Sequence, residues 1–398
     1  MRPATVASLA LLVFLPLTSA RTTAEECSAA VISSAAGADG RPLLWKNRDT
    51  DTLHNKVVFV AETPYAYMGV ADAVDASGRR IFVGLNAAGF AIMNTVAYNL
   101  PLKSGEARDF EGTIMADALR RCGSVDDFAA YLRENRGPGL GSPANYGVID
   151  ANGGAALFEV HNHGFERLDA TNAAEKSLLV TNFSRSGETD AGRGYVRFER
   201  VNALFHADED GKFSSAQVLQ SFARDLQNPY LPQLTPAFRA QLPADPPYLV
   251  HTQQTINRGS TAAAAVIHGV ERGRAPGEAT LWVLLGEPVC GIAVPLWVEA
   301  GEVPPELNAG EIAPINRESM RLKSLLRPFK DSERVEYANL ARLENQAGTG
   351  WLPRLVTTES AVFERTAAFL ATRPDRAAKA AFQKEIAADV LRSLKALR

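Results

Sequence analysis

Cysteine is scarce in this chain, with only three among 398 residues. A scaffold held by disulfides needs a higher density, so the fold must depend on a hydrophobic core. An odd number also leaves at least one thiol outside any intrachain disulfide. Cys122 ends an amphipathic helical pattern and Cys290 stands in an apolar, strand-like run, so these two are either core residues or one disulfide pair. Cys27 is then the spare thiol.

The sequence also lacks a strong excess of either charge. Its 42 lysines and arginines nearly balance 45 acidic residues, for a net charge of −3. A nucleic-acid-binding domain is usually basic, and a membrane-surface protein usually carries a polybasic patch, so neither partner is expected. After the N-terminal region no apolar run approaches the roughly 20 residues of a membrane helix, so we expect no membrane insertion once that region is removed.

The first 26 residues have the pattern of a removable leader. Arg2 precedes an apolar run at residues 6–17, and small residues, Thr18 and Ala20, follow. This order is typical of a secretory signal peptide. We predict a signal peptide over residues 1–20, a short pro-segment over 21–26, and a secreted or periplasmic mature chain that begins at Cys27. The alternative is a structureless N-terminus before an ordinary buried cysteine.

A chain that begins with cysteine carries a thiol and a free α-amine on one residue. Such a residue supplies a nucleophile and its base together. The amine has an ordinary pKa of roughly 7.7–8.0, which suits proton transfer near neutral pH. Chemistry of this kind also needs a carboxylate to hold the amine and donors for the oxyanion.

From Cys27 to about residue 298 the pattern is rich in strands, with turn residues between paired runs. Beyond residue 304 the apolar residues recur at helical spacing. We therefore predict an α+β fold of layered antiparallel sheets with helices outside, over residues 27–304, and a helical extension over 305–398. The predicted strands are 28–34, 42–47, 80–85, 90–95, 145–149, 155–161, 165–168, 177–182, 261–269, 280–285 and 291–298, and the predicted helices include 113–121 and 125–135.

Several short motifs resemble the choloylglycine hydrolase and isopenicillin N acyltransferase group. These proteins are cysteine N-terminal nucleophile hydrolases, which act on linear amide C–N bonds. The resemblance covers residues 27 to about 298 and implies a four-layer αββα sandwich. The motifs are CSAA at 27–30, WKNRD at 45–49, GLNAAGFA at 84–91, LVTNFS at 179–184, and LW at 281–282 leading to PL at 295–296.

The resemblance implies a role for each of five residues. Cys27 would be the nucleophile and, through its amine, the general base. Asp49 would anchor that amine, and Asn182 would donate to the oxyanion. Arg258 matches the late arginine near the nucleophile, and Asn94 is the candidate second oxyanion donor. Without the resemblance, Asp49 could cap a turn, Asn182 could satisfy a buried backbone group, and Arg258 could be a structural ion-pair residue.

The resulting hypothesis is an exported cysteine amidohydrolase that cleaves a small-molecule amide through a thioester. An acyltransferase, a dipeptidase on the same fold and a non-catalytic secreted binding protein are the alternatives. No metal or organic cofactor is implied, and homo-oligomers are common in the group. Members turn over bile-salt conjugates, penicillin V, N-acyl-homoserine lactones, β-alanyl amines or aminoacyl penicillins, and the expected pocket loops at 53–68, 98–110 and 185–195 hold no diagnostic pattern.

The sequence also allows a metal site as an alternative to a cysteine nucleophile. Glu159, His161 and His163 alternate along a predicted strand, so they share one face and could bind a metal ion. No His-Glu-x-x-His or Gly-x-Ser-x-Gly motif occurs, which disfavours a zinc peptidase and a serine hydrolase.

Three arginines lie within or shortly after the last expected pocket loop. Arg193, Arg197 and Arg200 could bind a carboxylate, but we interpret them as surface charges.

Overall fold

The computed structural model describes residues 26–75, 77–102, 108–135, 139–140, 143–208, 210–328 and 336–397. The predicted signal peptide (1–20) and residues 21–25 of the predicted pro-segment lie outside these ranges. Within the described ranges, no helix has the length and apolar character needed to cross a membrane.

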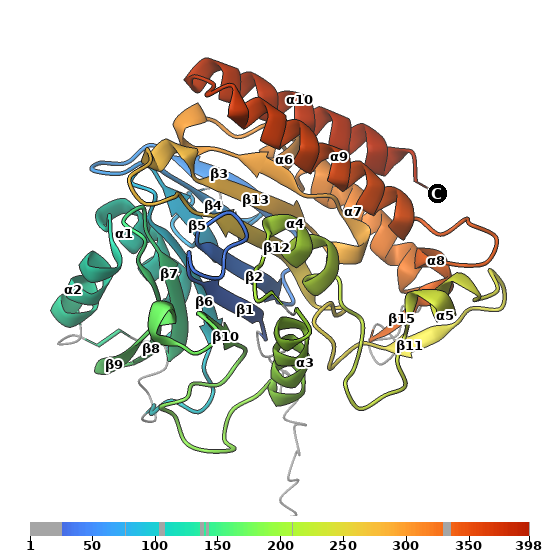
Figure 1. The fold of residues 1–398 in the computed structure, drawn as a ribbon, viewed down its shortest axis with the longest axis horizontal. Helices are drawn as coiled ribbons and strands as arrows, with labels where there is room; N and C mark the ends of the chain where they lie inside the picture. Colours follow the sequence, from blue (N-terminus) through green and yellow to red (C-terminus); the bar gives the residue numbers. More distant parts are fainter. Residues whose placement is uncertain are drawn as a thin grey trace, which may run out of the picture.

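Two antiparallel sheets form the centre of the molecule (Figure 1). The six-stranded sheet has the order β10-β1-β2-β12-β13-β14, and the seven-stranded sheet runs β3 to β9 in sequence order. The predicted hairpins β1/β2 and β5/β6 and the meander β7–β8–β9 are confirmed. The bounds are β1 Ser28–Ile32, β2 Leu43–Asp49, β3 Asn55–Val60, β4 Tyr67–Asp72, β5 Val83–Asn86, β6 Ala91–Val96, β7 Ala144–Ile149, β8 Ala155–His161, β9 Gly164–Asp169, β10 Ser177–Val180, β12 Thr261–His268, β13 Thr280–Leu285 and β14 Val294–Leu296.

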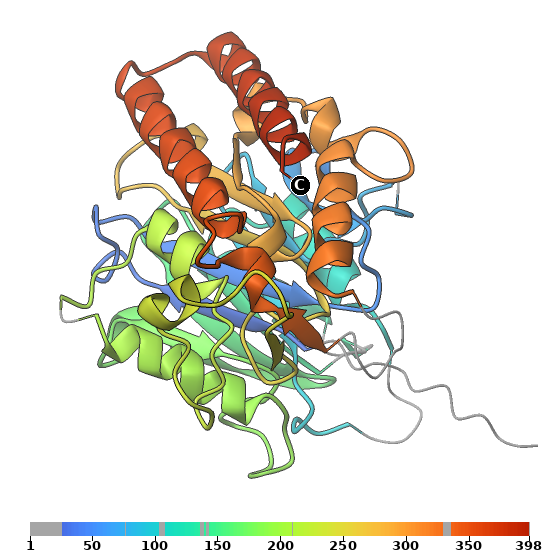
Figure 2. The ribbon, with the colours of Figure 1, turned by 90° about the vertical axis from the view of Figure 1, so that its right-hand side faces the viewer.

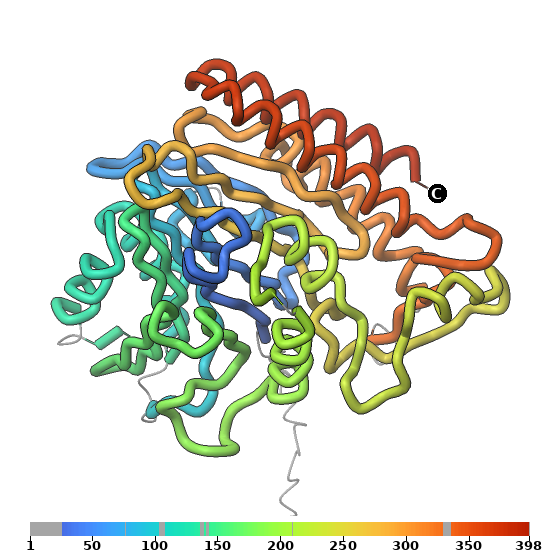
Figure 3. The backbone as a smooth tube through the Cα atoms, in the orientation of Figure 1, coloured from blue at the N-terminus to red at the C-terminus, as the bar shows by residue number. Residues whose placement is uncertain are grey.

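The sheets pack face to face through β1 and β2 of one sheet and β6 and β7 of the other. Figure 3 shows β1 and β2 in the middle of the fold. The contact is close because Gly147 on β7 faces Val31 and Leu44, where an added Cβ would lie 2.8 Å from Val31 Cγ2. The sheet interface therefore buries both faces of the strand that follows Cys27.

Helices α1 (Glu111–Arg121) and α2 (Val125–Asn135) cover the outer face of the seven-stranded sheet. Ser124 caps the N-terminus of α2, because the Asp127 backbone N–H donates to Ser124 Oγ at 3.1 Å. Asp127 Oδ2 in turn accepts from the Gly123 backbone N–H at 2.9 Å. This reciprocal arrangement satisfies N–H groups at the helix start.

Helices from the C-terminal part cover the six-stranded sheet, and α9 and α10 lie side by side in Figure 2. Ile386, Val390 and Leu394 form the predicted apolar stripe of α10, and all three are fully buried. The four-layer α+β sandwich is confirmed. The bounds are α6 Pro305–Asn308, α7 Pro314–Leu326, α9 Leu352–Ala371 and α10 Arg376–Lys395. The domain boundary at residue 304 stays a prediction.

Two local predictions are corrected by the structure. Half of the expected pocket loop at 53–68 is strand, in β3 and the start of β4, because the apolar run in Asn55–Val60 pairs along the sheet edge. Cys290 is predicted in a strand-like run, but it ends a short helical turn, Pro288–Cys290, since proline cannot donate to a strand ladder. Cys122 and Cys290 carry free thiols, so the disulfide alternative is also wrong.

Candidate active site

Cys27 lies directly before β1, at one end of the sheet interface, and is 2% exposed. Its backbone nitrogen donates to Oδ1 of Asn182 at 2.8 Å. Asn182 follows β10, which pairs with β1, so sheet pairing brings together residues 155 positions apart. The predicted nucleophile and the predicted oxyanion donor are therefore neighbours.

The side chain of Asn182 has a definite orientation. Its carbonyl oxygen faces the Cys27 nitrogen, and its amide nitrogen donates to the backbone oxygen of Val96 at 2.9 Å. The carbonyl is therefore placed to accept from a nitrogen on Cys27. An amide nitrogen carries two N–H donors, so donation to an oxyanion would use the N–H that does not face Val96.

Asp49 ends β2, the strand beside β1. The register pairs Ser28 with Asn47, and continuing it places Asp49 opposite Glu26, immediately before Cys27. A β-bulge after Thr261 directs that hydroxyl to Asp49 Oδ1 at 2.6 Å. Asp49 Oδ2 is buried and lacks a hydrogen-bond partner among the described residues.

The charge state of Asp49 is set by two opposed effects. Burial raises the pKa of its carboxyl, whereas the positive charges of Arg258 and Arg197 lower it, and the result is a pKa of about 6. Arg258 Nη1 lies 3.6 Å from Asp49 Oδ2. A buried carboxylate with an open oxygen and a raised pKa can accept a bond from an amine.

Arg258 lies against Glu26, the residue before Cys27. Its Nη1 donates to Glu26 Oε2 at 2.7 Å, and its backbone N–H donates to Thr261 Oγ1 at 3.0 Å. The alternative role as an ion-pair residue also applies, because Glu26 and Asp49 both face the same guanidinium nitrogen.

Asn94 points to a different neighbour. Its side-chain oxygen accepts from Nζ of Lys46 at 2.6 Å, and Lys46 also donates to the Phe82 backbone oxygen at 3.0 Å. Asn94 thus lies on the inner face of the seven-stranded sheet, against β2. Its role as the second oxyanion donor stays a prediction.

Arg197 is a site residue that the sequence analysis missed. It lies on α3 (Tyr195–His206) and is fully buried, so its interpretation as a surface charge is wrong. Nη1 donates to the backbone oxygen of Cys27 at 2.6 Å and to Ser28 Oγ at 3.1 Å. Nη2 donates to Asn182 Oδ1 at 2.9 Å and to Glu26 Oε2 at 3.1 Å. One guanidinium therefore fixes both ends of the Cys27–Asn182 contact.

The sequence did hold a signal for this burial. Arg197, Val201 and Phe205 are the buried residues of α3, and their spacing of four places them on one helix face. Gly194 makes the approach possible, because its φ is +79° and an added Cβ would lie 2.5 Å from Arg197 Nη2. Of the other two arginines, Arg200 pairs with Asp225 and Arg193 is half-exposed.

The metal alternative is not supported. Glu159 is buried and accepts from the backbone N–H groups of Arg185 and Ser186, each at 2.7 Å. Across the described ranges no group of three His, Cys, Asp or Glu side chains could hold a metal ion. Glu159 instead holds the loop that follows Asn182.

The loop that carries Arg258 is supported from the C-terminal helices. Glu287 is fully buried and accepts from Asn257 Nδ2 at 2.8 Å and from Arg327 Nη2 at 2.7 Å. Lys323 on α7 lies 3.6 Å from Glu287 and also donates to the Gly259 backbone oxygen. These contacts bracket Arg258 on both sides.

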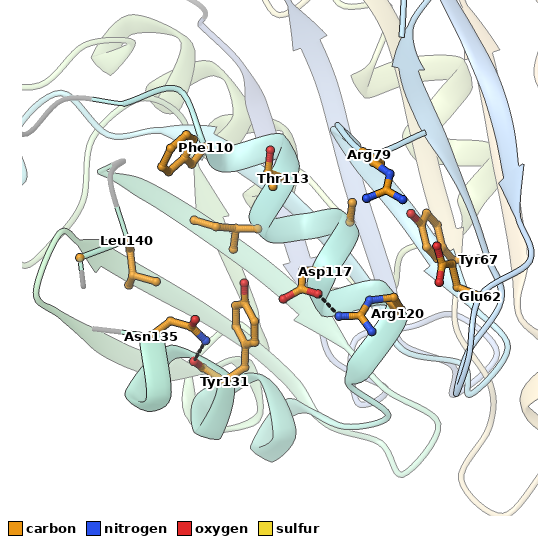
Figure 4. Close-up of a pocket in the computed structure, with 13 residues that line it drawn as sticks. Glu62, Tyr67, Arg79, Phe110, Thr113, Asp117, Arg120, Tyr131, Asn135 and Leu140 are labelled. Atoms are coloured by element: carbon orange, nitrogen blue, oxygen red, sulfur yellow. Dashed lines mark hydrogen bonds and ion pairs between the residues drawn. The ribbon is translucent and has the colours of Figure 1, made fainter. Parts of the chain in front are cut away.

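A cavity of about 500 Å³ lies elsewhere, beside α1 and α2 on the outer face of the seven-stranded sheet (Figure 4). Figure 4 shows Asp117 paired with Arg120, and Tyr131 beside Asn135, at its wall. Its lining shares no residue with the cluster around Cys27. It is therefore separate from the candidate active site.

No protein-family model matches the chain, and no curated protein sequence matches it. Solved structures do. A mutant conjugated bile acid hydrolase from Clostridium perfringens is 9% identical with a TM-score of 0.37, over 65% of this chain and 89% of that one. A penicillin V acylase from Agrobacterium tumefaciens is 13% identical with a TM-score of 0.37, over 68% and 86%. A Caenorhabditis elegans N-acylethanolamine-hydrolyzing acid amidase ortholog is 15% identical with a TM-score of 0.34, over 46% and 83%. Bile-salt and penicillin V hydrolases are among the proteins that the sequence motifs resemble.

Proposed function

We propose that this chain is an exported amidohydrolase in which the thiol of Cys27 is the nucleophile and its α-amine is the base. The proposal rests on one observation: the Cys27 nitrogen sits against Asn182 Oδ1, and a buried oxygen of Asp49 lacks a hydrogen-bond partner among the described residues. Cleavage of the Glu26–Cys27 bond creates an amine at that nitrogen. An amine has the extra donors that an amide nitrogen lacks, so it can bond Asn182 and Asp49 together.

The reaction would proceed through a covalent thioester. The amine takes the thiol proton, and Sγ of Cys27 attacks the carbonyl carbon of the substrate amide. The protonated amine then gives its proton to the leaving nitrogen, and the C–N bond breaks. Water, activated by the same amine, hydrolyses the thioester and releases the acid. Arg197 holds the Cys27 backbone oxygen in place throughout.

The test begins with intact mass measurement of the secreted protein, for wild type beside Cys27→Ser and Cys27→Ala. We expect a wild-type chain that starts at Cys27. Retention of Glu26 by the alanine variant alone would identify the cleavage as self-catalysed. A wild-type chain that starts at residue 21 would overturn the proposal, because Cys27 would then have no free amine.

The second stage of the test measures turnover. Processed wild type is incubated with a panel of fluorogenic linear amides, and the acyl-enzyme is sought by mass after rapid acid quenching. A mass increase equal to the acyl group, absent after thiol alkylation, is the expected result. Turnover that survives alkylation would exclude Cys27 as the nucleophile.

A further inference from the structure

The side chain of Glu26 lies among three arginines next to Cys27. Glu26 Oε2 lies 2.7 Å from Arg258 Nη1 and 3.1 Å from Arg197 Nη2, and Glu26 Oε1 lies 4.0 Å from Arg193 Nη1. Burial acts to raise the pKa of this carboxyl, but the charges of Arg258 and Arg197 outweigh it and lower the pKa. Glu26 is thus bound as an anion.

Removal of Glu26 would leave these arginines without that anion. Arg197 is fully buried, and the Arg258 side chain is 11% exposed, so water reaches neither guanidinium well. Among the described residues, Asp49 would then be the carboxylate that still acts on both guanidinium groups. Two buried positive charges beside one carboxylate are incompletely compensated, which is costly, so the processed site favours another anion in the place of Glu26.

The position of that anion relative to the reacting carbon follows from covalent structure. The carbonyl carbon of Glu26 is bonded to the Cys27 nitrogen, and three carbons (Cα, Cβ and Cγ) separate it from the Glu26 carboxylate carbon. If Cys27 cleaves its own peptide bond, the Sγ–carbon bond forms, the carbon–nitrogen bond breaks, and the thiol proton goes to the departing amine. Glu26 is then the acyl group of a thioester on Cys27, and water hydrolyses that thioester.

A thioester formed from an external amide has the same connectivity at Sγ. We therefore infer that the processed site selects acyl groups in which three carbons separate the reacting carbonyl carbon from a carboxylate, namely glutaryl or α-glutamyl amides, and that Arg258 and Arg197 bind this carboxylate. The inference rests on the proposed function, since it requires Cys27 to be the terminal nucleophile. It adds the substrate class.

The test compares 7-amido-4-methylcoumarin derivatives on processed wild-type protein whose mass shows that it starts at Cys27. The glutaryl amide is compared with the pentanoyl amide, which has the same length without the charge, and with the succinyl and adipoyl amides. We expect kcat/KM for glutaryl to exceed that for pentanoyl by roughly 10- to 100-fold, as a charge-assisted pair contributes. Equal or faster turnover of pentanoyl overturns the substrate class but leaves the amidase function intact.

A binding measurement further distinguishes failure of the proposed substrate class from failure of the proposed amidase function. Glutarate and pentanoate are titrated calorimetrically into processed wild type and into Cys27→Ala protein whose mass shows that it retains Glu26, so that Glu26 still covers the arginines. We expect glutarate to bind processed wild type at least tenfold more tightly than pentanoate, and to bind the alanine variant at least tenfold more weakly than wild type. Equal glutarate binding by both proteins would place the anion site elsewhere. Selective glutarate binding without turnover of any amide would instead count against the amidase function.

Discussion

Asn182 Oδ1 accepts two hydrogen bonds at once, from the Cys27 backbone nitrogen at 2.8 Å and from Arg197 Nη2 at 2.9 Å. The guanidinium thereby fixes the amide with its carbonyl toward Cys27 and its nitrogen toward Val96. This orientation suits an amine holder, whereas the role implied by the sequence resemblance is donation to the oxyanion. The first role uses the amide oxygen and the second uses an amide N–H.

Substitutions at Asn182 distinguish these roles. Asn182→Ala removes both functions, and Asn182→Asp keeps an acceptor but, when ionised, loses every donor. If an N–H of the Asn182 amide stabilises the oxyanion, kcat for the preferred amide falls by roughly 10²–10³-fold in both variants. We expect this parallel loss. An aspartate variant with near-wild-type kcat would show that the acceptor role alone matters.

Asp49 gives a prediction about pH and stability. Burial raises its pKa from 3.8 to about 6 in the folded chain, so folding is favoured while the carboxyl is protonated. This contribution is complete below the unfolded pKa and is lost as the pH rises through about 6, because the folded state binds the proton more tightly. The difference between the two pKa values corresponds to about 3 kcal/mol.

Urea unfolding of unprocessed Cys27→Ala with and without Asp49→Asn checks this sign. At pH 7.5 the asparagine variant is expected to be more stable by about 1–3 kcal/mol, and at pH 3.5 the two should agree within error. Equal stability at both pH values would mean that Asp49 is not held in a raised-pKa state. In the otherwise wild-type chain the same substitution should abolish amide turnover, because the amine loses its anchor.

The sequence predicted most of the candidate site, since Cys27, Asp49, Asn182 and Arg258 all lie within one connected set of contacts. Three of them lie at or beside the ends of strands in one sheet. The predicted hairpins and the order of the motifs therefore indicated that these residues would lie close together. Asn94 is predicted as an oxyanion donor from its place near a strand end, but in the structure its side-chain oxygen accepts from Lys46 on the facing sheet. Which side chain lies opposite depends on how two sheets stack, and no local pattern encodes that.

Other parts of the site depend on long-range packing. Lys323 and Arg327 come from a helix that the sequence placed in a separate extension, yet they contact Glu287 and the loop of Arg258. The burial of Arg197, in contrast, could be predicted from local sequence, because its spacing with Val201 and Phe205 indicates a buried helix face. A charged residue on such a face is a site candidate.

Substitution of Arg197 should lower stability and kcat more than substitution of Arg200, which lies on the same helix. Arg197→Lys replaces a planar fork with one ammonium, which cannot reach Cys27, Asn182 and Ser28 together. We expect a loss of about 2–4 kcal/mol in unfolding free energy and at least a tenfold lower kcat at a temperature where the variant is folded. Arg200→Lys is the matched control, because its pair with Asp225 is partly exposed and should cost less than about 1 kcal/mol.

The measurement is kcat and KM for the preferred amide, with melting curves for both variants. A loss confined to stability, with normal kcat in the folded fraction, would limit Arg197 to a structural role. A loss in kcat with little change in KM would support positioning of the nucleophile.

The C-terminal helices should affect catalysis through Glu287. Burial acts to raise the pKa of this carboxyl, but Arg327 and Lys323 lower it overall, so the ionised form is favoured in the folded chain. Its stabilising contribution is present above the unfolded pKa and is lost as the pH falls through the folded pKa. Glu287→Gln should therefore destabilise the protein by about 3–5 kcal/mol at pH 7 and remove this part of the acid sensitivity.

Glu359→Gln is the control for that substitution. Glu359 also makes a buried ion pair, with Arg224 at 2.7 Å, and it accepts from the Ala293 backbone, but neither contact reaches the loop of Arg258. Both variants should lose stability, whereas only Glu287→Gln should lower kcat in the folded protein, because Asn257 and Lys323 then lose the carboxylate that brackets Arg258. Turnover at pH 7, measured well below the melting temperature of each variant, separates the two. Equal kcat in the two variants would show that Arg258 keeps its place without this support, and that the helices of the C-terminal part serve stability alone.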